Sequence, residues 1–262
     1  MVKKEPTERI LYFDIETSMC EMYAWGLGKQ YVGYEQIKKE RQVICIAWKW
    51  EHEKEVHALS WNHKLHKSDA YDDDADKVML MAFSKVYNSA DLAVGHNGLR
   101  FDVASINARL MRYDLPLLDP ILFDDTYLKT KHIRLNCHKL DYLGKYLNVG
   151  KKHGTSYTLW INCMNGDKKA LDEMVKYCAQ DVSLLAKIYN KVKKYIKSNL
   201  NLSVIRDDKN ICPSCGGHLK KNGIKRTATL GLRQTFVCTS CGKNSTNGIN
   251  LIKKANQYPR SM

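Results

Sequence analysis

The sequence contains no long apolar segment. Its apolar runs are short, with residues 43–48 and 78–83 typical, whereas a helix that spans a bilayer needs ~20 such residues. A membrane-spanning protein is therefore excluded. The basic residues Lys3 and Lys4 are not followed by an apolar stretch, so we expect no secretory signal and a cytoplasmic location.

Acidic residues are in deficit. The chain has 28 Asp and Glu against 42 Lys and Arg, a net charge of +14 at pH 7. A surplus of this size favours a polyanionic partner, either nucleic acid or an anionic membrane surface. No basic amphipathic helix with an aromatic apolar face is evident, which favours nucleic acid over a membrane. A generically basic protein without such a partner remains the alternative.

The basic surplus and the cysteines are unevenly distributed. Residues 207–262 contain ten Lys and Arg and only two acids, a net charge of +8, which leaves 14 − 8 = +6 for residues 1–206. This tail is rich in Gly, Asn, Thr and Lys and holds four of the nine cysteines. We therefore predict a first domain over residues 1–206 and a small basic module over residues 207–262. Without a secretory signal, the cysteines are expected to be reduced thiols or metal ligands rather than disulfides.

Strand and helix patterns alternate within the first domain. This order is typical of an α/β domain with a mixed sheet flanked by helices. Apolar and β-branched residues predict the strands, and 3.6-residue spacing predicts the helices. The expected strands are residues 9–17, 43–50, 56–61, 92–94 and 121–128, and the expected helices are 76–88, 103–112, 140–147, 171–176 and 179–195.

Two carboxylates stand two residues apart on the most apolar predicted strand. Asp14 and Glu16 share one face of this strand at a spacing of ~7 Å, while Phe13 and Ile15 point the opposite way, into the core. The pair is a candidate metal site. Taken alone it is a weak signal, because such triplets also occur on solvated strands.

Two further sets of residues are equally weak signals of a functional site when each is taken alone. Asp102 begins a predicted helix, where a carboxylate can act simply as a cap, and Asn97 with Gly98 can form an ordinary turn. Tyr177 and Asp181 lie four residues apart, so on a helix they share one face; this spacing is also common in surface pairs.

Together, these groups resemble the DEDD superfamily of 3′–5′ exonucleases in its DEDDy branch. That superfamily has a ribonuclease H-like fold and includes the proofreading domains of family A and B DNA polymerases. The resemblance covers about residues 9–197, and the DEDDh branch is disfavoured because Lys176 stands where its histidine would be. Two other stretches are similar to stand-alone, family B polymerase-like exonucleases of phages and bacteria: DIETS followed by YAWGL (residues 14–18 and 23–27), and KLDYLGKYL followed by VGKK (residues 139–147 and 149–152).

The resemblance implies a metal-dependent hydrolase. Four carboxylates of this kind can hold two Mg²⁺ or Mn²⁺ ions about 3.5–4 Å apart across a scissile phosphate. Tyr177 would orient the attacking water, and Asn97 would help to hold the terminal nucleotide. His96 is expected to be structural and Phe101 to pack in the core behind Asp102. The implied metal ligands are Asp14, Glu16, Asp102 and Asp181.

The implied substrate is the 3′ end of DNA, single-stranded or frayed, with nucleoside 5′-monophosphates as products. RNA remains an alternative, as do structure-specific endonuclease action and a non-catalytic nucleic-acid-binding protein. The chain is too short for a polymerase domain beside the exonuclease domain, so any proofreading would act in trans, with replication or repair proteins as partners. If the chain is phage-encoded, as the subfamily suggests, its location would be the host cytoplasm.

The tail contains two C-x2-C pairs separated by 22 residues. Cys212, Cys215, Cys238 and Cys241 supply four soft thiolates in the pattern of a structural Zn²⁺ site, and Gly216 and Gly242 allow the tight turns after each pair. A redox dithiol is the alternative. His218 and the other five cysteines (Cys20, Cys45, Cys137, Cys163, Cys178) show no ligand spacing.

The tail resembles a zinc ribbon over about residues 210–245. Its charge suggests that it holds a nucleic-acid backbone near the exonuclease cleft, with Phe236 as a stacking group; a structural cap or a protein contact are the alternatives. The candidate substrate-binding residues of the tail are Lys220, Lys221, Lys225, Arg226 and Arg233.

Overall fold

The computed structural model describes residues 8–61, 74–226 and 231–251. The chain forms two compact units: one spans residues 8–191, and the other begins at Val192. The boundary expected between residues 206 and 207 remains a prediction. Within the described residues, no helix combines the length and apolarity required to cross a membrane.

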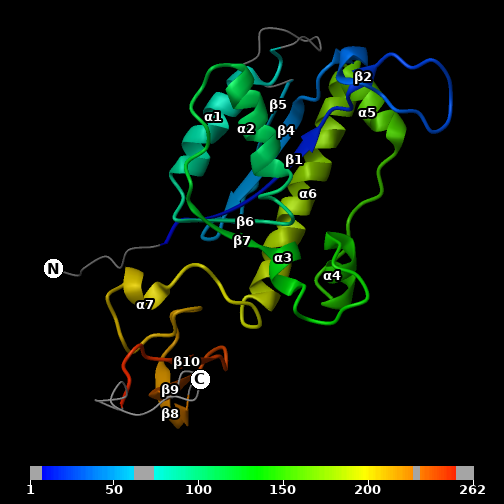
Figure 1. Cartoon of the computed structure of the whole chain (residues 1–262). Coiled ribbons are helices and arrows are strands. Elements are labelled where there is room, and N and C mark those ends of the chain that lie inside the picture. The colour runs from blue at the N-terminus through cyan, green and yellow to red at the C-terminus, as the bar shows by residue number, and fades with distance from the viewer. Residues whose placement is uncertain (1–7, 62–73, 227–230, 252–262) are drawn as a thin grey trace, which may run out of the picture. The chain divides into compact units, whose positions relative to one another are not determined.

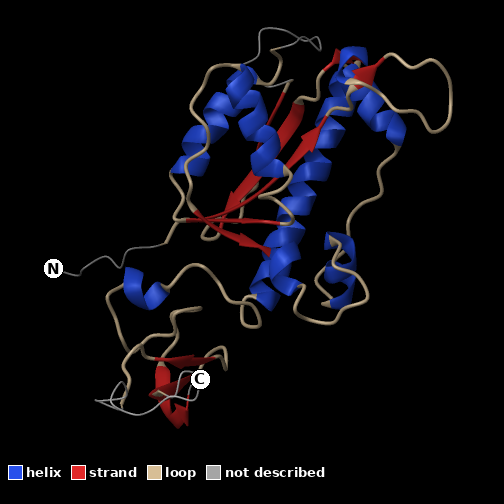
Figure 2. Cartoon of the chain, viewed as in Figure 1, coloured by secondary structure: helices blue, strands red, loops and turns tan. Residues whose placement is uncertain are grey.

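A five-stranded mixed sheet forms the centre of the first unit (Figures 1 and 2). Its order is β5-β4-β1-β6-β7; β4 runs antiparallel to both β1 and β5, whereas β1, β6 and β7 run parallel to one another. The expected α/β fold with a mixed sheet is confirmed. The sheet strands are β1 (Ile10–Thr17), β4 (Val43–Trp50), β5 (His57–Ser60), β6 (Leu92–Gly95) and β7 (Leu122–Asp125).

Helices cover both faces of this sheet. Figure 1 shows α1 (Lys77–Asn88) and α2 (Asp102–Arg112) on one side and α6 (Lys168–Val192) on the other. The alternation along β1 explains the layers: the Phe13 ring packs on Phe83 and Tyr87 of α1, whereas the Tyr12 ring packs on Tyr189 of α6. Even-numbered residues of β1 therefore face α6, and this places Asp14 and Glu16 on the α6 side.

The remaining elements of the first unit are short. A two-stranded ladder pairs β2 (Glu21–Met22) with β3 (Ile37–Lys39), and the 3-10 helix η1 (Tyr34–Gln36) precedes β3. Three short helices follow the sheet strands: α3 (Thr126–Thr130), α4 (Leu140–Tyr146) and α5 (Tyr157–Met164).

Two predictions of local structure are wrong. Residues 171–176 and 179–195 were expected as separate helices, yet α6 is continuous, because its buried stripe through Met174, Cys178 and Val182 is unbroken. The strand expected over 121–128 ends at Asp125. There the Asp125 carboxylate accepts the backbone N–H groups of Tyr127 and Leu128, and so starts α3.

The second unit contains a three-stranded antiparallel sheet of order β10-β9-β8. Its strands are β8 (Leu219–Arg226), β9 (Leu232–Cys238) and β10 (Asn244–Thr246), and the short helix α7 (Leu202–Ile205) precedes them.

Candidate active site

Three of the predicted carboxylates meet between β1 and α6. Oxygen atoms of Asp14, Glu16 and Asp181 lie within 4.8 Å of one another. The two-residue period of β1 directs Asp14 and Glu16 to the α6 side, and the Sγ of Cys178 on α6 lies 3.3 Å from the Asp14 carbonyl oxygen. Asp181, one turn further along α6, is thereby brought to the same place.

Burial makes this acidic group electrostatically unusual. Desolvation raises the pKa of Asp14 to about 7, and the negative charge of Asp181 adds to this increase. Desolvation also raises the pKa of Glu16 to about 8, and there the charge of Asp14 adds to the increase. The Lys152 ammonium lowers both pKa values in part. Burial likewise raises the pKa of Asp181. Near neutral pH, Asp14 and Glu16 therefore take up either protons or cations.

Tyr177 lies beside Asp181, as the four-residue spacing on a helix requires. It lies on the same face of α6 as Asp181, and the Lys152 ammonium lies over its ring. Burial and the charge of Asp181 raise the pKa of the phenol above its ordinary value, so Tyr177 remains protonated at neutral pH and can act as a donor. The edge of the Trp160 ring, from α5, packs against it at 6.3 Å between centroids.

Lys152 is a site residue that the sequence reasoning did not identify. Its Nζ lies 2.7 Å from Asp181 Oδ2 and 5.4 Å from the centre of the Tyr177 ring. Burial lowers the Lys152 pKa, but the charges of Asp181 and Asp14 outweigh that effect and raise it, so the ammonium is permanently charged. It partly neutralises the acidic group.

The loop that delivers Lys152 is held by α4. Asp141 accepts the backbone N–H of Lys152 at 2.9 Å and pairs with Lys145 at 2.5 Å. Gly144 lies so close to this loop that a Cβ there would be 2.7 Å from the Gly150 carbonyl oxygen. The two stretches that carried the family resemblance at residues 139–147 and 149–152 thus have a physical role, which is to bring Lys152 to Asp181.

Asp102 stands next to these three carboxylates at the beginning of α2. It is buried, and its Oδ1 accepts the backbone N–H of Ile15 at 3.0 Å. Burial and the neighbouring charge of Asp14 raise its pKa well above the ordinary range. A Cβ added at Gly98 would lie 3.6 Å from Asp102 Oδ2 and 2.8 Å from the Phe123 ring, so the turn before α2 packs closely around this carboxylate.

The turn after β6 carries Asn97 in a left-handed conformation, with φ 64°. Its backbone N–H donates to Asp125 Oδ1 at 2.9 Å. This contact is possible because β6 and β7 are paired neighbours, with Gly95 opposite Asp125. His96 contacts the Thr126 hydroxyl at 2.9 Å, and burial lowers its pKa to about 4, so it is neutral. Phe101 is 38% exposed, so the expectation that it packs in the core is wrong: it is the residue just before α2 and lies at the surface.

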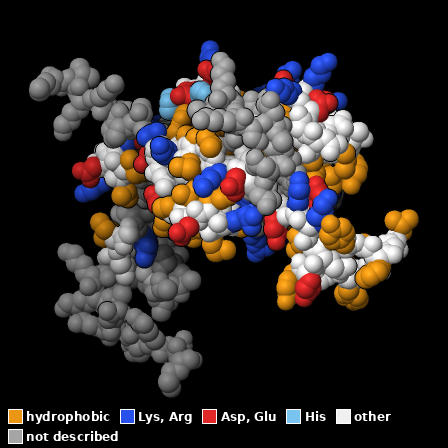
Figure 3. Space-filling model, turned by 90° about the horizontal axis from the view of Figure 1, so that it is seen from above, with side chains coloured by type: hydrophobic (Ala, Val, Ile, Leu, Met, Phe, Trp, Pro, Cys, Tyr) orange, Lys and Arg blue, Asp and Glu red, His pale blue; other side chains and the backbone are white. Residues whose placement is uncertain are grey.

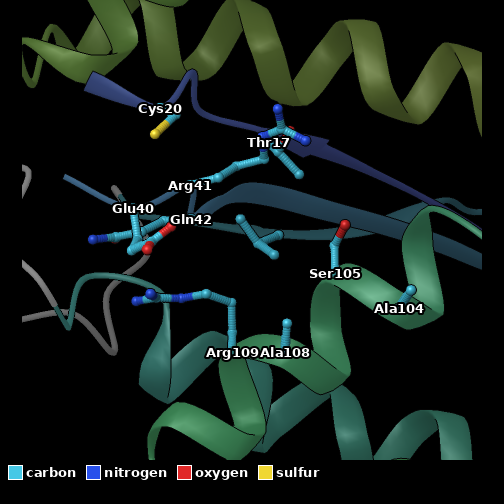
Figure 4. Close-up of a pocket in the computed structure, with 10 residues that line it drawn as sticks. Thr17, Cys20, Glu40, Arg41, Gln42, Ala104, Ser105, Ala108 and Arg109 are labelled. Carbon is cyan, nitrogen blue, oxygen red and sulfur yellow. The ribbon is translucent and has the colours of Figure 1, made fainter. Parts of the chain in front are cut away.

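A cavity of about 470 Å³ lies between α2 and the end of β1. Figure 4 shows Thr17 and Cys20 on one side and Ser105 and Arg109 of α2 on the other. Thr17 follows Glu16 directly, and Ser105 lies one turn after Asp102. None of the four candidate carboxylates is part of the cavity's lining, and Asp14 and Glu16 point to the opposite, α6 side of β1, so the cavity is not part of the acidic group.

A second group of candidate ligands lies in the second unit. The Sγ atoms of Cys212, Cys215, Cys238 and Cys241 all lie within 4.8 Å of one another; Cys212 and Cys241 are 3.8 Å apart, and Cys215 and Cys238 are 3.5 Å apart. Sulfur atoms around a tetrahedral zinc ion with Zn–S bonds of ~2.3 Å are separated by about 3.8 Å.

The turns around these cysteines have the predicted form. Gly216 and Gly242 both have φ 72°, a conformation that glycine adopts without strain. The backbone N–H groups of Ser214 and Cys241 donate to the Sγ atoms of Cys212 and Cys238, at 3.5 Å each. The geometry and the soft thiolate ligands fit one metal ion.

The predicted basic residues of the tail lie on β8 and β9. Pairing of Lys225 with Arg233 and of Lys220 with Val237 puts Lys220, Lys225 and Arg233 on one face of the sheet. Lys221 pairs with Phe236 and shares the other face with Arg226. Like charges directly opposite each other, as at Lys225 and Arg233, destabilise a sheet unless an anion neutralises them.

The carboxylate group also fits metal ions. Mg²⁺ and Mn²⁺ prefer oxygen ligands, and the carboxylates of Asp14, Glu16 and Asp181 gather such oxygens around one volume. The structure does not bring Asp102 into this group of three, although the charges of Asp14 and Glu16 act on its carboxyl group.

Comparisons with known proteins agree with this architecture. Residues 11–193 match the family model of the RNase H superfamily. The structure is similar to that of the family B DNA polymerase from the hyperthermophilic archaeon Pyrobaculum calidifontis, with a TM-score of 0.52 and 18% sequence identity. That match covers 72% of this chain and 25% of the polymerase, so the chain spans about a quarter of the polymerase's length, and the likeness is one of fold. No curated protein matches the chain in sequence.

Proposed function

The chain belongs to the RNase H superfamily, and we propose that within it the protein is a DEDDy-type 3′–5′ exonuclease acting on DNA. It would remove nucleotides from single-stranded or frayed 3′ ends and release nucleoside 5′-monophosphates. The observation that carries this proposal is the meeting of Asp14, Glu16 and Asp181 within 4.8 Å, with Tyr177 one turn from Asp181 on the same face of α6.

The residues have distinct roles in the proposed reaction. Asp14, Glu16, Asp102 and Asp181 would hold two Mg²⁺ or Mn²⁺ ions, which lower the pKa of a bound water and stabilise negative charge on the phosphate. The Tyr177 hydroxyl would donate to and orient the attacking water; its raised pKa argues against a role as base.

Two other side chains would support these groups. The Lys152 ammonium holds Asp181 in place and adds positive charge where the phosphate binds. Asn97, fixed in its turn by Asp125, would help to hold the terminal nucleotide.

The decisive experiment uses a 5′-labelled DNA strand with Mg²⁺, with Mn²⁺ and with EDTA. We expect a ladder that shortens from the 3′ end with either metal and intact substrate with EDTA. Clear preference for a matched RNA strand would overturn the choice of DNA. Cleavage of a circular single strand, which has no end, would identify an endonuclease. Binding of the strand without any cleavage would contradict a nuclease and favour the non-catalytic alternative.

For the tail we propose a zinc ribbon that binds the nucleic-acid backbone. The four cysteines would hold one structural Zn²⁺, and the basic residues of β8 and β9 would contact phosphates. The distances between the cysteine Sγ atoms support the zinc site. The cross-strand pair of Lys225 and Arg233 supports phosphate binding, because a bound phosphate would neutralise these two like charges.

Replacing both Lys225 and Arg233 by alanine is expected to weaken the binding of single-stranded DNA and make it less sensitive to salt. Each lost phosphate contact lowers the slope of log K against log salt by about 0.7, so the double variant should lose about 1.4. Fluorescence anisotropy at several salt concentrations measures both quantities.

A matched control replaces Lys54 and Lys85, two exposed lysines of the first unit, and should leave the slope within the error of the wild type. An unchanged slope in the Lys225 and Arg233 variant would show that the ribbon has another role, such as a protein contact. Release of about one zinc ion per chain on thiol modification would test the metal assignment separately.

A further inference from the structure

The segment from the end of β2 to the first residue of η1 carries a concentration of exposed aromatic side chains. Tyr23, Trp25, Tyr31 and Tyr34 are 66%, 99%, 105% and 82% exposed, and Leu27 is fully exposed as well. In Figure 1 this segment projects as a loop from the first unit, and in Figure 3 hydrophobic side chains gather on the same projection. Residues 23–34 are called the aromatic loop below.

The base of the aromatic loop is fixed. The backbone N–H of Tyr23 donates to the Gln36 carbonyl at 2.8 Å, and the Gln36 side chain donates to the Tyr23 carbonyl at 2.9 Å. Gln36 Oε1 also accepts the backbone N–H of Gly33 at 2.9 Å. The exposed aromatic rings therefore extend from an anchored hairpin rather than from a free end of the chain.

The chemistry of the aromatic loop favours nucleobases. Four of its large exposed side chains are flat aromatic rings, whereas Leu27 and Val32 are its only exposed large aliphatic ones. The loop carries Lys29 and no acidic residue. Around it, Lys38, Lys39 and Arg41 stand with Glu21, Glu35 and Glu40, and Lys38 pairs with Glu21 at 3.3 Å, so residues 21–41 have a net charge of +1. Aromatic faces beside positive charge are the features that bind unpaired bases and their phosphates without sequence preference.

The aromatic loop is also close in the chain to the carboxylates. Only six residues separate Glu16 from Tyr23, and at ~3.6 Å per residue the two positions lie at most about 25 Å apart. A strand whose 3′ end sits at the carboxylates would therefore reach the aromatic loop within a few nucleotides.

We infer that the aromatic loop is a stacking platform for unpaired bases on the 5′ side of the terminal nucleotide. This inference rests on the proposed function for its choice of nucleic acid. It adds a second contact with the single strand, separate from the metal site, and it requires no hydrolysis.

The test is a binding experiment in EDTA, so that its result does not depend on catalysis. The probe is a 5′-fluorescein-labelled 20-residue thymidine strand, and the readout is anisotropy. Alanine in place of Trp25 or Tyr31 should raise Kd about tenfold in each case, because loss of one base–aromatic stack typically has an effect of this size. Because the chain has five tryptophans, the quenching of tryptophan emission on strand binding should be compared between the wild type and Trp25→Ala, and it should be smaller in the variant.

Two controls separate stacking from general hydrophobicity. Leu27→Ala lies in the same loop, and Met111→Ala removes an equally large side chain from α2 that is 71% exposed; both should change Kd less than twofold. Wild-type affinity in the Trp25 and Tyr31 variants would overturn the inference. So would a loss of DNA affinity in Leu27→Ala equal to that in Trp25→Ala, since that outcome indicates general hydrophobic contact rather than stacking of aromatic rings.

The two proposals can fail separately. If the wild type binds the strand through Trp25 and Tyr31 but hydrolyses no DNA or RNA with Mg²⁺ or Mn²⁺, the nuclease proposal is wrong and the stacking platform stands. If hydrolysis occurs and the aromatic variants bind normally, the stacking platform is wrong and the nuclease proposal stands.

Discussion

Asparagine in place of Asp14 is expected to lower the rate of 3′-end hydrolysis by on the order of 10²- to 10³-fold. The substitution keeps the shape of the side chain but removes its negative charge. Asp14 lies at the centre of the acidic group, since it interacts with Asp181, Glu16 and Asp102. Its loss should therefore weaken every metal position that the group offers.

The measurement is single-turnover hydrolysis of a 5′-labelled strand at saturating Mn²⁺. Asp172→Asn is the matched control, because Asp172 is an exposed acid on α6, and it should retain the wild-type rate. Near-normal hydrolysis by the Asp14 variant, with the control unaffected, would show that the cluster of carboxylates takes no part in the reaction. Circular dichroism would establish that both variants fold.

A second large effect concerns stability. Without metal, the melting temperature should fall as pH rises from about 5 to about 8.5. In the folded chain, the pKa is about 7 for Asp14 and about 8 for Glu16, whereas unfolded carboxyl groups titrate near 4. Between these values the folded state binds more protons than the unfolded state, so rising pH costs stability. The fall should be roughly 5 °C or more.

Mn²⁺ should reverse this fall at pH 8, because ionised carboxylates that repel one another become ligands and binding stabilises the folded state. Scanning calorimetry from pH 5 to 8.5, in EDTA and in Mn²⁺, measures both effects. An Asp14→Asn, Glu16→Gln double variant should flatten the pH dependence. Lys152→Met should extend the fall to higher pH, because Lys152 lowers the pKa of both carboxyl groups. A melting temperature that rises with pH in EDTA would contradict this account.

Periodicity alone was enough to place much of the candidate site. The two-residue repeat of β1 put Asp14 and Glu16 on one face, and the helical repeat put Tyr177 beside Asp181; both relations are local. The spacing of the cysteine pairs likewise predicted that four thiols would meet. Local patterns repeat regularly, so a sequence displays them directly.

Contacts between distant segments were not predictable in this way. Lys152 reaches Asp181 only because α4 holds its loop, and Asp125 fixes the Asn97 turn only because β6 and β7 are neighbours. One feature of the sequence could have pointed to Lys152. Several acids were expected in one buried site, and buried negative charges need a cation close to them. Exposure was misjudged at Phe101, because an apolar side chain beside a helix start is ordinarily buried.

The unbroken course of α6 restricts how the length of this chain can vary. Cys178 lies against Asp14, and Tyr189 packs on Tyr12 and donates to Asp124 at 2.7 Å. One residue inserted between 178 and 189 would rotate everything after it by about 100° and pull Tyr189 away from the sheet. Natural insertions and deletions are therefore expected outside this stretch, for example in the turn between β4 and β5, where added residues would leave the spacing along α6 intact.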